Sequence, residues 1–240
     1  MTAVYGGRGR IGLIVPANNS VIEPELWSAL PEGYAAHATR ILAKGELTAE
    51  AVRRMEREAD AALEAIAATR VDVIAYCDMV TTFIMEPGWN EAAVERFSRL
   101  AGVPCLSAWT ALRDALQSLG VRRMALGTPY PRAIHALAPP FFAQRGYDVA
   151  THATLDILAM HDVPQVDGER LRAFVARMDV GGCDALVLLA TDLPTFACIE
   201  PLEQALGIPV VSSNQAILWA ALRALGAPRP ARAPGRLFRR

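Results

Sequence analysis

Short apolar runs alternate with amphipathic segments along most of the chain. Uninterrupted apolar runs that end on small polar residues indicate buried strands, and segments with apolar side chains on one face indicate helices. Strands are expected at residues 11–16, 71–77, 103–106, 123–128, 148–153, 184–190 and 208–212. Helices are expected from residue 48 onward, over 108–119, around 134–145, and over 167–178 and 215–225. This alternation is typical of an α/β fold with a mainly parallel sheet.

Local signals mark the ends of two of these helices. Thr48 is a suitable N-cap, and Glu50 lies in the first turn that follows it. The apolar residues behind this cap share one helical face, namely Val52, Met55, Ala59, Ala62, Leu63 and Ile66. Gly120 follows the helix 108–119 and suits the left-handed position at which many helices end.

Three pieces of the first half of the chain recur in the same order in the second half. The segment 10-RIGLIVPANN-19 resembles 123-RMALGTPYPR-132, 71-VDVIAYCDMVTTF-83 resembles 183-CDALVLLATDLPTF-196, and 102-GVPCLSAWTAL-112 resembles 207-GIPVVSSNQAI-217. Three such pairs in register indicate duplication. We therefore predict two similar Rossmann-like halves related by pseudo-twofold symmetry. Residues 1–112, joined by a C-terminal helix at 214–240, form one half, and residues 113–213 form the other.

Duplication also predicts where a ligand binds. In open α/β sheets the binding site lies beyond the carboxyl ends of the strands, so two facing halves bring two sets of strand ends to one cleft. Those ends are Pro16–Ser20, Cys77–Thr82, Thr128–Tyr130, Ala190–Thr195 and Ser212–Asn214. They are rich in Asn, Ser, Thr and Tyr and poor in positive charge, and backbone N–H groups at the following helix starts favour an anion. A small carboxylate is the expected ligand.

Composition and charge exclude several other classes of function. The 240 residues are 52% hydrophobic and 20% charged, with a formal net charge of −1, so neither nucleic acid nor a membrane is an expected partner. No apolar stretch has the length of a membrane span, and the first residues lack the apolar core of a secretory signal. We expect a cytoplasmic protein whose four cysteines are reduced. Their spacing indicates no metal site.

Four motifs resemble the aspartate/glutamate racemase superfamily, and within it the branch of maleate isomerases and arylmalonate decarboxylases. They are 12-GLIVPANNSVIEPE-25, 127-GTPY-130, 208-IPVVSSNQA-216 and 235-GRLF-238. The resemblance covers nearly the whole chain. It implies an isomerase or lyase that acts on a small mono- or dicarboxylic acid without a cofactor or a metal. A homo-oligomer, either a dimer or a tetramer, is also expected.

The same resemblance identifies candidate catalytic residues and a departure from the family pattern. Members of the superfamily carry a cysteine at the end of the middle strand in one or both halves, because the pKa of a thiol can be tuned near neutrality. In this chain the second-half position falls on Ala190, and Asp192 takes the acidic or imidazole place. The first-half position falls on Asp78 by ungapped counting and on Cys77 after a shift of one residue, and both remain open. Catalysis is expected from Cys77 or Asp78, with Asp192 as a second acid or base.

Carboxylate binding is assigned to polar residues at the strand ends. These are Asn19, Thr128, Tyr130, Thr191, Ser213 and Asn214. Simpler structural roles compete with the catalytic ones, since Asp78 and Asp192 also suit helix N-caps and Cys77 suits a buried core thiol. Ala190 supports a second hypothesis, because it is inert where the resemblance expects a nucleophile. In that hypothesis the chain is a carboxylate-binding or regulatory protein that kept the cleft and lost catalysis.

Overall fold

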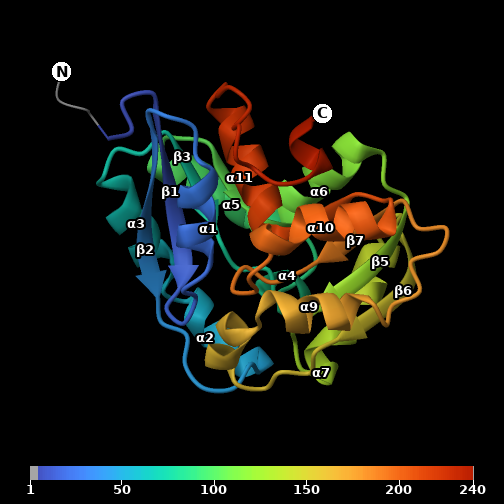
Figure 1. Ribbon diagram of the computed structural model, residues 1–240. Coiled ribbons are helices and arrows are strands. Elements are labelled where there is room, and N and C mark those ends of the chain that lie inside the picture. The colour runs from blue at the N-terminus through green and yellow to red at the C-terminus, as the bar shows by residue number, and fades with distance from the viewer. Residues whose placement is uncertain (1–4, 240) are drawn as a thin grey trace.

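The computed structural model describes residues 5–239 as two four-stranded parallel sheets with helices packed around them (Figure 1). The first sheet contains β1 (Gly9–Pro16), β2 (Tyr34–Ile41), β3 (Val73–Tyr76) and β4 (Cys105–Ser107). The second contains β5 (Arg123–Thr128), β6 (Asp148–Thr154), β7 (Ala185–Leu188) and β8 (Val210–Ser212). The strand orders are β2-β1-β3-β4 and β6-β5-β7-β8. Because the two orders are the same, the predicted duplicated α/β fold is confirmed.

Helices precede and follow the strands in both halves of the chain. Those before β5 are α1 (Ile22–Ala29), α2 (Ala49–Glu56), α3 (Ala59–Ala67), α4 (Thr81–Ile84), α5 (Trp89–Ala101) and α6 (Ala108–Leu119). Those after it are α7 (Arg132–His135), α8 (Ala138–Ala143), α9 (Gly168–Val175), α10 (Phe196–Leu206) and α11 (Ser213–Ala224), with the 3-10 helices η1 (Met160–Gln165) and η2 (Arg236–Arg239). In Figure 1 the helices α6 and α11 lie in the centre, between the two sheets.

The central helices α6 and α11 begin in the same way. Each follows the last strand of its sheet, and each starts with a capping box, built by Ser107 with Thr110 and by Ser212 with Gln215. They pack against each other, and α11 also contacts β3, β4 and β8. The C-terminal helix therefore touches both sheets. The division of the chain into residues 1–112 with 214–240 and residues 113–213 stays a prediction.

The structure confirms the two helix signals and corrects some helix lengths. The hydroxyl oxygen of Thr48 accepts the N–H of Ala51 at 3.2 Å, and Gly120 has a φ of 69° at the end of α6. The helix expected from residue 48 is two helices, α2 and α3, because the chain turns at residues 57–58. The helix expected around 134–145 is likewise divided into α7 and α8. The elements α1, β2, α4, α5, α10 and η1 were not predicted.

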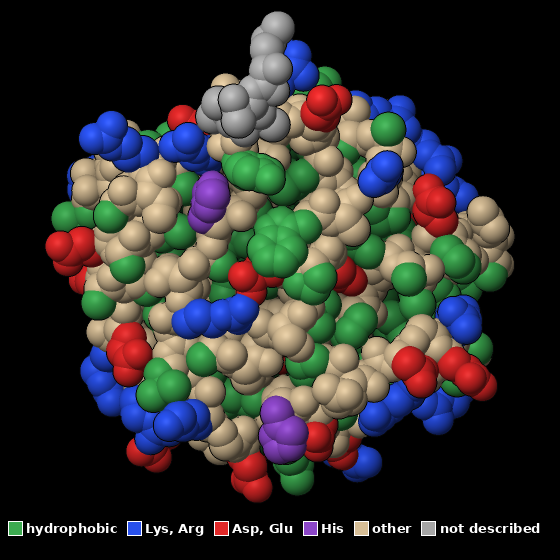
Figure 2. Space-filling model, turned by 60° about the vertical axis from the view of Figure 1, so that its left-hand side comes forward, with side chains coloured by type: hydrophobic (Ala, Val, Ile, Leu, Met, Phe, Trp, Pro, Cys, Tyr) green, Lys and Arg blue, Asp and Glu red, His purple; other side chains and the backbone are tan. Residues whose placement is uncertain are grey.

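The two aspartates that precede the middle strands have matching roles. A carboxylate oxygen of Asp72 accepts the N–H of Arg10 at 2.8 Å, and one of Asp184 accepts the N–H of Arg123 at 2.8 Å. On the face shown in Figure 2, acidic and basic side chains are interspersed and no broad field of one sign develops. Within residues 5–239, no helix is long and apolar enough to cross a membrane.

Candidate functional site

A small, largely enclosed cavity of about 40 Å³ lies where the carboxyl ends of the two sheets face each other. Segments after β1, β3, β5 and β7 supply its polar lining, and α2 and the segment around η1 supply much of its apolar lining. The lining residues are Pro16, Asn18, Asn19, Ala43, Leu47, Ala51, Val52, Met55, Asp78, Met79, Val80, Tyr130, Ile157, Met160, Val163, Ala190, Thr191 and Asp192. The cavity lies in the predicted cleft, because parallel strands deliver their carboxyl ends to one edge of each sheet.

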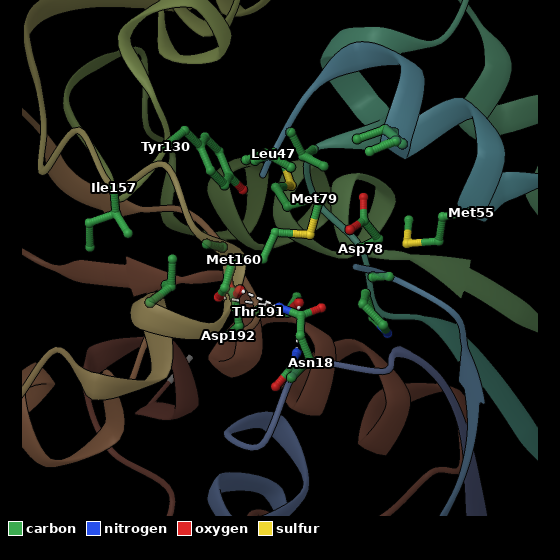
Figure 3. A pocket seen from close by; sticks show the side chains of 18 residues that line it. Asn18, Leu47, Met55, Asp78, Met79, Tyr130, Ile157, Met160, Thr191 and Asp192 are labelled. Carbon is green, nitrogen blue, oxygen red and sulfur yellow. Dashed lines mark hydrogen bonds between the residues drawn. The ribbon is translucent and has the colours of Figure 1, made fainter. Parts of the chain in front are cut away.

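Two acidic side chains face this cavity from different sides. Figure 3 shows Asp78 beside Met55, and Thr191 and Asp192 across the cavity, with the side chain of Met79 between the two groups. Most of the remaining lining is aliphatic or thioether surface. The two carboxyl groups therefore face a predominantly apolar space.

Cys77 points away from the cavity. Cys77 and Asp78 follow directly after β3, and Asp78 lines the cavity whereas Cys77 packs in the hydrophobic core. Cys77 is 0% exposed, and its Sγ lies 3.3 Å from the carbonyl oxygen of Ala75. Burial raises the pKa of the Cys77 thiol, and the nearby charge of Asp78 raises it further. A thiol in this environment is a poor nucleophile.

The hydrogen bonds of the middle strands make Asp78 the counterpart of Ala190. Cys77 and Leu189 each donate their N–H to the neighbouring first strand of their sheet, at 2.8 and 3.0 Å, so they occupy equivalent positions. The next residues are Asp78 and Ala190. Ala190 has a φ of 90°, a conformation that costs a residue with a side chain roughly 1–3 kcal/mol. Such strain is common at functional sites.

The carboxyl groups of Asp78 and Asp192 have no cationic partner in the described part of the chain. Asp78, which is 8% exposed, accepts the N–H of Thr81 at 2.7 Å, and Asp192 accepts the side-chain amide of Asn18 at 3.3 Å. Burial raises the pKa of Asp78. Burial, and then the charge of Asp78, raise the pKa of Asp192 to about 7. At neutral pH Asp192 therefore populates both protonation states, as a general acid or base requires.

Asn19 and Thr191 connect the two halves at the floor of the cavity. The Asn19 amide donates to Thr191 Oγ1 at 3.1 Å, and the Thr191 hydroxyl donates to the carbonyl oxygen of Cys77 at 2.8 Å. The Asn19 side-chain oxygen accepts the N–H groups of Val21 and Ile22 at the start of α1. Both predicted ligands line the cavity, and both also have a structural role.

Asn18 is a lining residue that sequence reasoning missed. Its amide reaches Asp192 at 3.3 Å and the carbonyl oxygen of Met160 at 3.4 Å. Its own side-chain oxygen is buried, and no donor from residues 5–239 reaches it. Its place beside Asn19 in the strand-end segment is the signal that could have identified it.

Ser213 and Asn214 lie behind the cavity. Both are fully buried. The Asn214 amide donates to Glu25 at 2.7 Å and to the carbonyl oxygen of Thr191 at 2.9 Å. Glu25, which was not predicted, also accepts two N–H groups at the start of α10, at 2.5 and 2.7 Å. In this geometry Asn214 positions Thr191.

Thr128 also lies outside the cavity lining, although Tyr130 contributes to it. The Thr128 hydroxyl is 2.9 Å from His135 Nδ1, and His135 Nε2 is 2.9 Å from His152 Nδ1. Burial raises the pKa of Tyr130 well above its ordinary value. Its phenol therefore stays protonated and can donate a hydrogen bond.

A further acid, Glu56, lies close to Asp78 and was not predicted. The Tyr76 hydroxyl donates to Glu56 Oε2 at 2.7 Å. Burial raises the pKa of Glu56 to about 7, with Asp78 contributing to the rise and Tyr76 opposing it. The charge of Asp78 is thus felt both by Glu56 and by Asp192.

Segments from both halves close the cavity. The N–H of Leu47 donates to the carbonyl oxygen of Leu158 at 3.1 Å, and the N–H of Met160 donates to that of Gly45 at 3.3 Å. These bonds join the segment before α2 to the segment before η1. Over residues 5–239, the structure has no cluster of His, Cys, Asp or Glu side chains suited to hold a metal ion.

Comparison with known proteins agrees with the fold. The family described as arylmalonate decarboxylase matches residues 11–238. The chain is 30% identical to the arylmalonate decarboxylase of Bordetella bronchiseptica, over 94% of this chain and 91% of that protein. It superposes on a maleate isomerase variant from Pseudomonas putida S16 with maleate, at a TM-score of 0.91 and 28% identity, over 96% and 97% of the two chains. A Nocardia farcinica maleate isomerase mutant with a covalently bound succinylcysteine intermediate superposes at 0.90 and 28% identity, over 96% and 98%.

Proposed function

Because the chain belongs to the arylmalonate decarboxylase family, we propose that its cavity binds a small carboxylic acid and that Asp78 and Asp192 move a proton at the carbon next to the carboxylate. The protein is an enzyme of the isomerase or lyase type. One observation carries the specific proposal. Two carboxyl groups line the cavity, whereas none of its described lining residues is a cysteine.

Neutral donors are available for the substrate carboxylate. The phenol of Tyr130 belongs to the cavity lining, and so does the amide of Asn19, which has one N–H beyond its bond to Thr191. The hydroxyl of Thr191 already donates to the carbonyl oxygen of Cys77, and the amide of Asn18 to Asp192 and Met160. Donors of this kind stabilise negative charge that develops on a carboxylate as an enolate forms.

Proton transfer then requires a side chain that can donate a proton to the substrate carbon or remove one from it. Asp192 suits this role, because a carboxyl with a pKa of about 7 both accepts and returns a proton near neutral pH. In a decarboxylation, the electron pair of the broken carbon–carbon bond stays on the substrate as carbon dioxide leaves, and a carboxylic acid of the protein then donates its proton to that carbon. In a proton-transfer isomerisation, one carboxylate removes the proton and the other carboxylic acid supplies one.

The placement of the thiol argues against a covalent route. The Nocardia farcinica mutant holds a succinylcysteine, which requires a cysteine sulfur in contact with the substrate. In this chain Cys77 is packed in the core behind the strand end, and its counterpart in the second half is Leu189. We therefore favour proton transfer or decarboxylation over thiolate addition to a double bond.

Turnover of three variants tests the proposal, after a screen of small carboxylic acids has identified a substrate. Asp78→Asn and Asp192→Asn should each lower kcat by roughly 100-fold or more, because each removes a titrating proton. Cys77→Ser should keep most of the activity, since a serine hydroxyl can make the same bond to Ala75. Circular dichroism and thermal unfolding check that each variant folds.

Two results would contradict the proposal. If Cys77→Ser is inactive and Asp78→Asn is active, the catalytic group is the Cys77 thiol and not the Asp78 carboxyl. Full activity of all three variants would show that the active site lies outside this cavity. Direct substrate contacts by Thr128, Ser213 and Asn214 stay predictions, as do a homo-oligomeric assembly and a cytoplasmic location.

A further inference from the structure

We propose that Met79 determines which substituents a substrate can carry on the carbon next to its carboxylate. The Met79 side chain lies between Asp78 and Asp192 in the cavity lining, so a ligand that contacts both carboxyl groups must displace it (Figure 3). This inference rests on the proposed function and deepens it, because it concerns the size of the acid that the same cavity binds. Met79 acts here through its shape and takes no part in proton transfer.

The cavity is too small for a carboxylic acid while Met79 keeps this position. Its volume is about 40 Å³, which is room for about three water molecules. Even a short acid such as propionate needs more space than this. Binding therefore requires part of the lining to move.

Met79 can move as a side chain while its backbone stays in place. The Asp78 carboxylate accepts the N–H of Thr81 at 2.7 Å, and the carbonyl oxygen of Met79 accepts the N–H of Thr82 at 3.3 Å. These bonds hold the turn between β3 and α4. Met79 is 1% exposed, but its unbranched thioether has three rotatable bonds and adjoins the cavity. It can therefore change rotamer without a change in the turn that carries Asp78.

The displaced thioether limits the size of the ligand. Figure 3 shows Met55 and Met79 on opposite sides of Asp78, so the space beside this carboxyl group is bounded from two directions. A small substituent next to the carboxylate leaves room for the thioether, whereas an aromatic one meets it. Overfilling a packed space is costly, so we expect discrimination by size.

Calorimetry at pH 6 with a series of acids tests this assignment. Propionate, isobutyrate and 2-phenylpropionate share the carboxylate and differ in the substituents on the adjacent carbon. Wild-type protein should bind 2-phenylpropionate about tenfold or more weakly than propionate, because the phenyl ring meets Met79. Met79→Ala should bind 2-phenylpropionate about tenfold or more tightly than the wild type does, since it removes the thioether.

Two control variants separate the place of the thioether from the loss of a buried side chain. Met79→Leu keeps a side chain of similar volume, so it should preserve the order of affinities found for the wild type. Met178→Ala makes the same truncation at a buried methionine outside the cavity lining, and it should preserve that order too. Thermal unfolding checks that each variant folds.

A measurement on the wild-type protein keeps the test independent of the folding of Met79→Ala. In protein labelled with ¹³C at the methionine methyl groups, the Met79 signal is assigned by its loss in Met79→Leu. Saturation with isobutyrate should shift this signal, because the bound acid displaces the thioether. The signals of Met124 and Met178, which lie outside the cavity lining, should stay in place.

The same order of affinities in the wild type and in folded Met79→Ala would overturn the inference. An unchanged Met79 signal in protein saturated with isobutyrate would overturn it equally. Both results leave proton transfer by Asp78 and Asp192 intact, so they are distinguishable from a failure of the proposed function. If neither protein binds any acid of the series, the proposed function fails, and this inference fails with it.

Discussion

Asp78 is the counterpart of Ala190 in the duplicated halves, and its carboxyl group changes what the cavity can bind. Asp78 and Asp192 add up to two negative charges to a space with no cation among its lining residues. A bound carboxylate would add further negative charge in an environment of low dielectric constant. The cavity therefore accepts an anion most readily when these carboxyl groups are protonated.

Anion affinity should fall as the pH rises through about 7, because Asp192 then ionises. Calorimetry with isobutyrate and with malonate at pH 6 and pH 8 measures the effect. We expect about a tenfold loss of affinity for isobutyrate and a larger loss for malonate, which carries a second charge. Asp192→Asn should remove most of this pH dependence, and Asp162→Asn, at an exposed acid in η1, should preserve it. Affinity that is independent of pH in the wild-type protein would contradict this account.

Sequence patterns predicted some elements well, and the reasons for the failures are physical. The buried strands β1, β3, β5 and β7 are nearly continuous apolar runs, which periodicity detects readily. The strand β2 lies at a sheet edge and is half exposed, so its apolar pattern is weak. Helix α10 contains Pro201 in its interior. Proline has a low helix propensity, so the sequence pattern did not indicate a helix there. Cys77 and Asp78 follow β3 outside the regular strand, so alternation of side chains could not show which of the two enters the cavity.

The carboxylate of Glu25 joins helices α1, α10 and α11. This structural role was not predicted from the sequence. Glu25 accepts two N–H groups at the start of α10 and the amide of Asn214 at the start of α11. A negative charge at the N-terminus of a helix accepts hydrogen bonds from its free N–H groups and interacts favourably with the helix dipole. Because Asn214 also holds the carbonyl oxygen of Thr191, this junction fixes part of the cavity floor.

Glu25→Ala should destabilise the protein by about 3 kcal/mol, because it leaves several buried donors without an acceptor. Glu25→Gln should cost less, since the amide oxygen still accepts hydrogen bonds. Glu32→Ala, at an exposed position after α1, is the control and should change the free energy of unfolding by less than about 0.5 kcal/mol. Urea unfolding measures all three. Equal stability of Glu25→Ala and Glu32→Ala would show that the junction has no energetic role.

Across the whole molecule, the buried acids with raised pKa values lie at or near the junction of the two halves. Duplication brings strand ends together, so Glu25 bonds to Phe196 and Asp192 bonds to Asn18 across the junction. Burial raises the pKa values of Asp78, Asp192, Glu25 and Glu56. Burial therefore gives acid–base groups that titrate near neutral pH. It also lowers the stability of the folded protein when those groups ionise, because a buried charge is costly.

The free energy of unfolding should fall as the pH rises from about 5 to about 7. In this range the folded protein holds protons that the unfolded chain has lost, because the pKa values of Asp192 and Glu56 lie near 7 in the folded state and near their ordinary values when unfolded. Stability is thus highest below the unfolded pKa values, and the loss is complete once the pH exceeds the folded ones. The double variant Asp78→Asn with Asp192→Asn should flatten this dependence by about 2 kcal/mol between pH 5 and pH 8, measured by urea unfolding at each pH. If wild type and variant instead give parallel curves, these carboxyl groups are ionised in the folded protein throughout that range, and acid–base catalysis by Asp192 near neutral pH loses its physical basis.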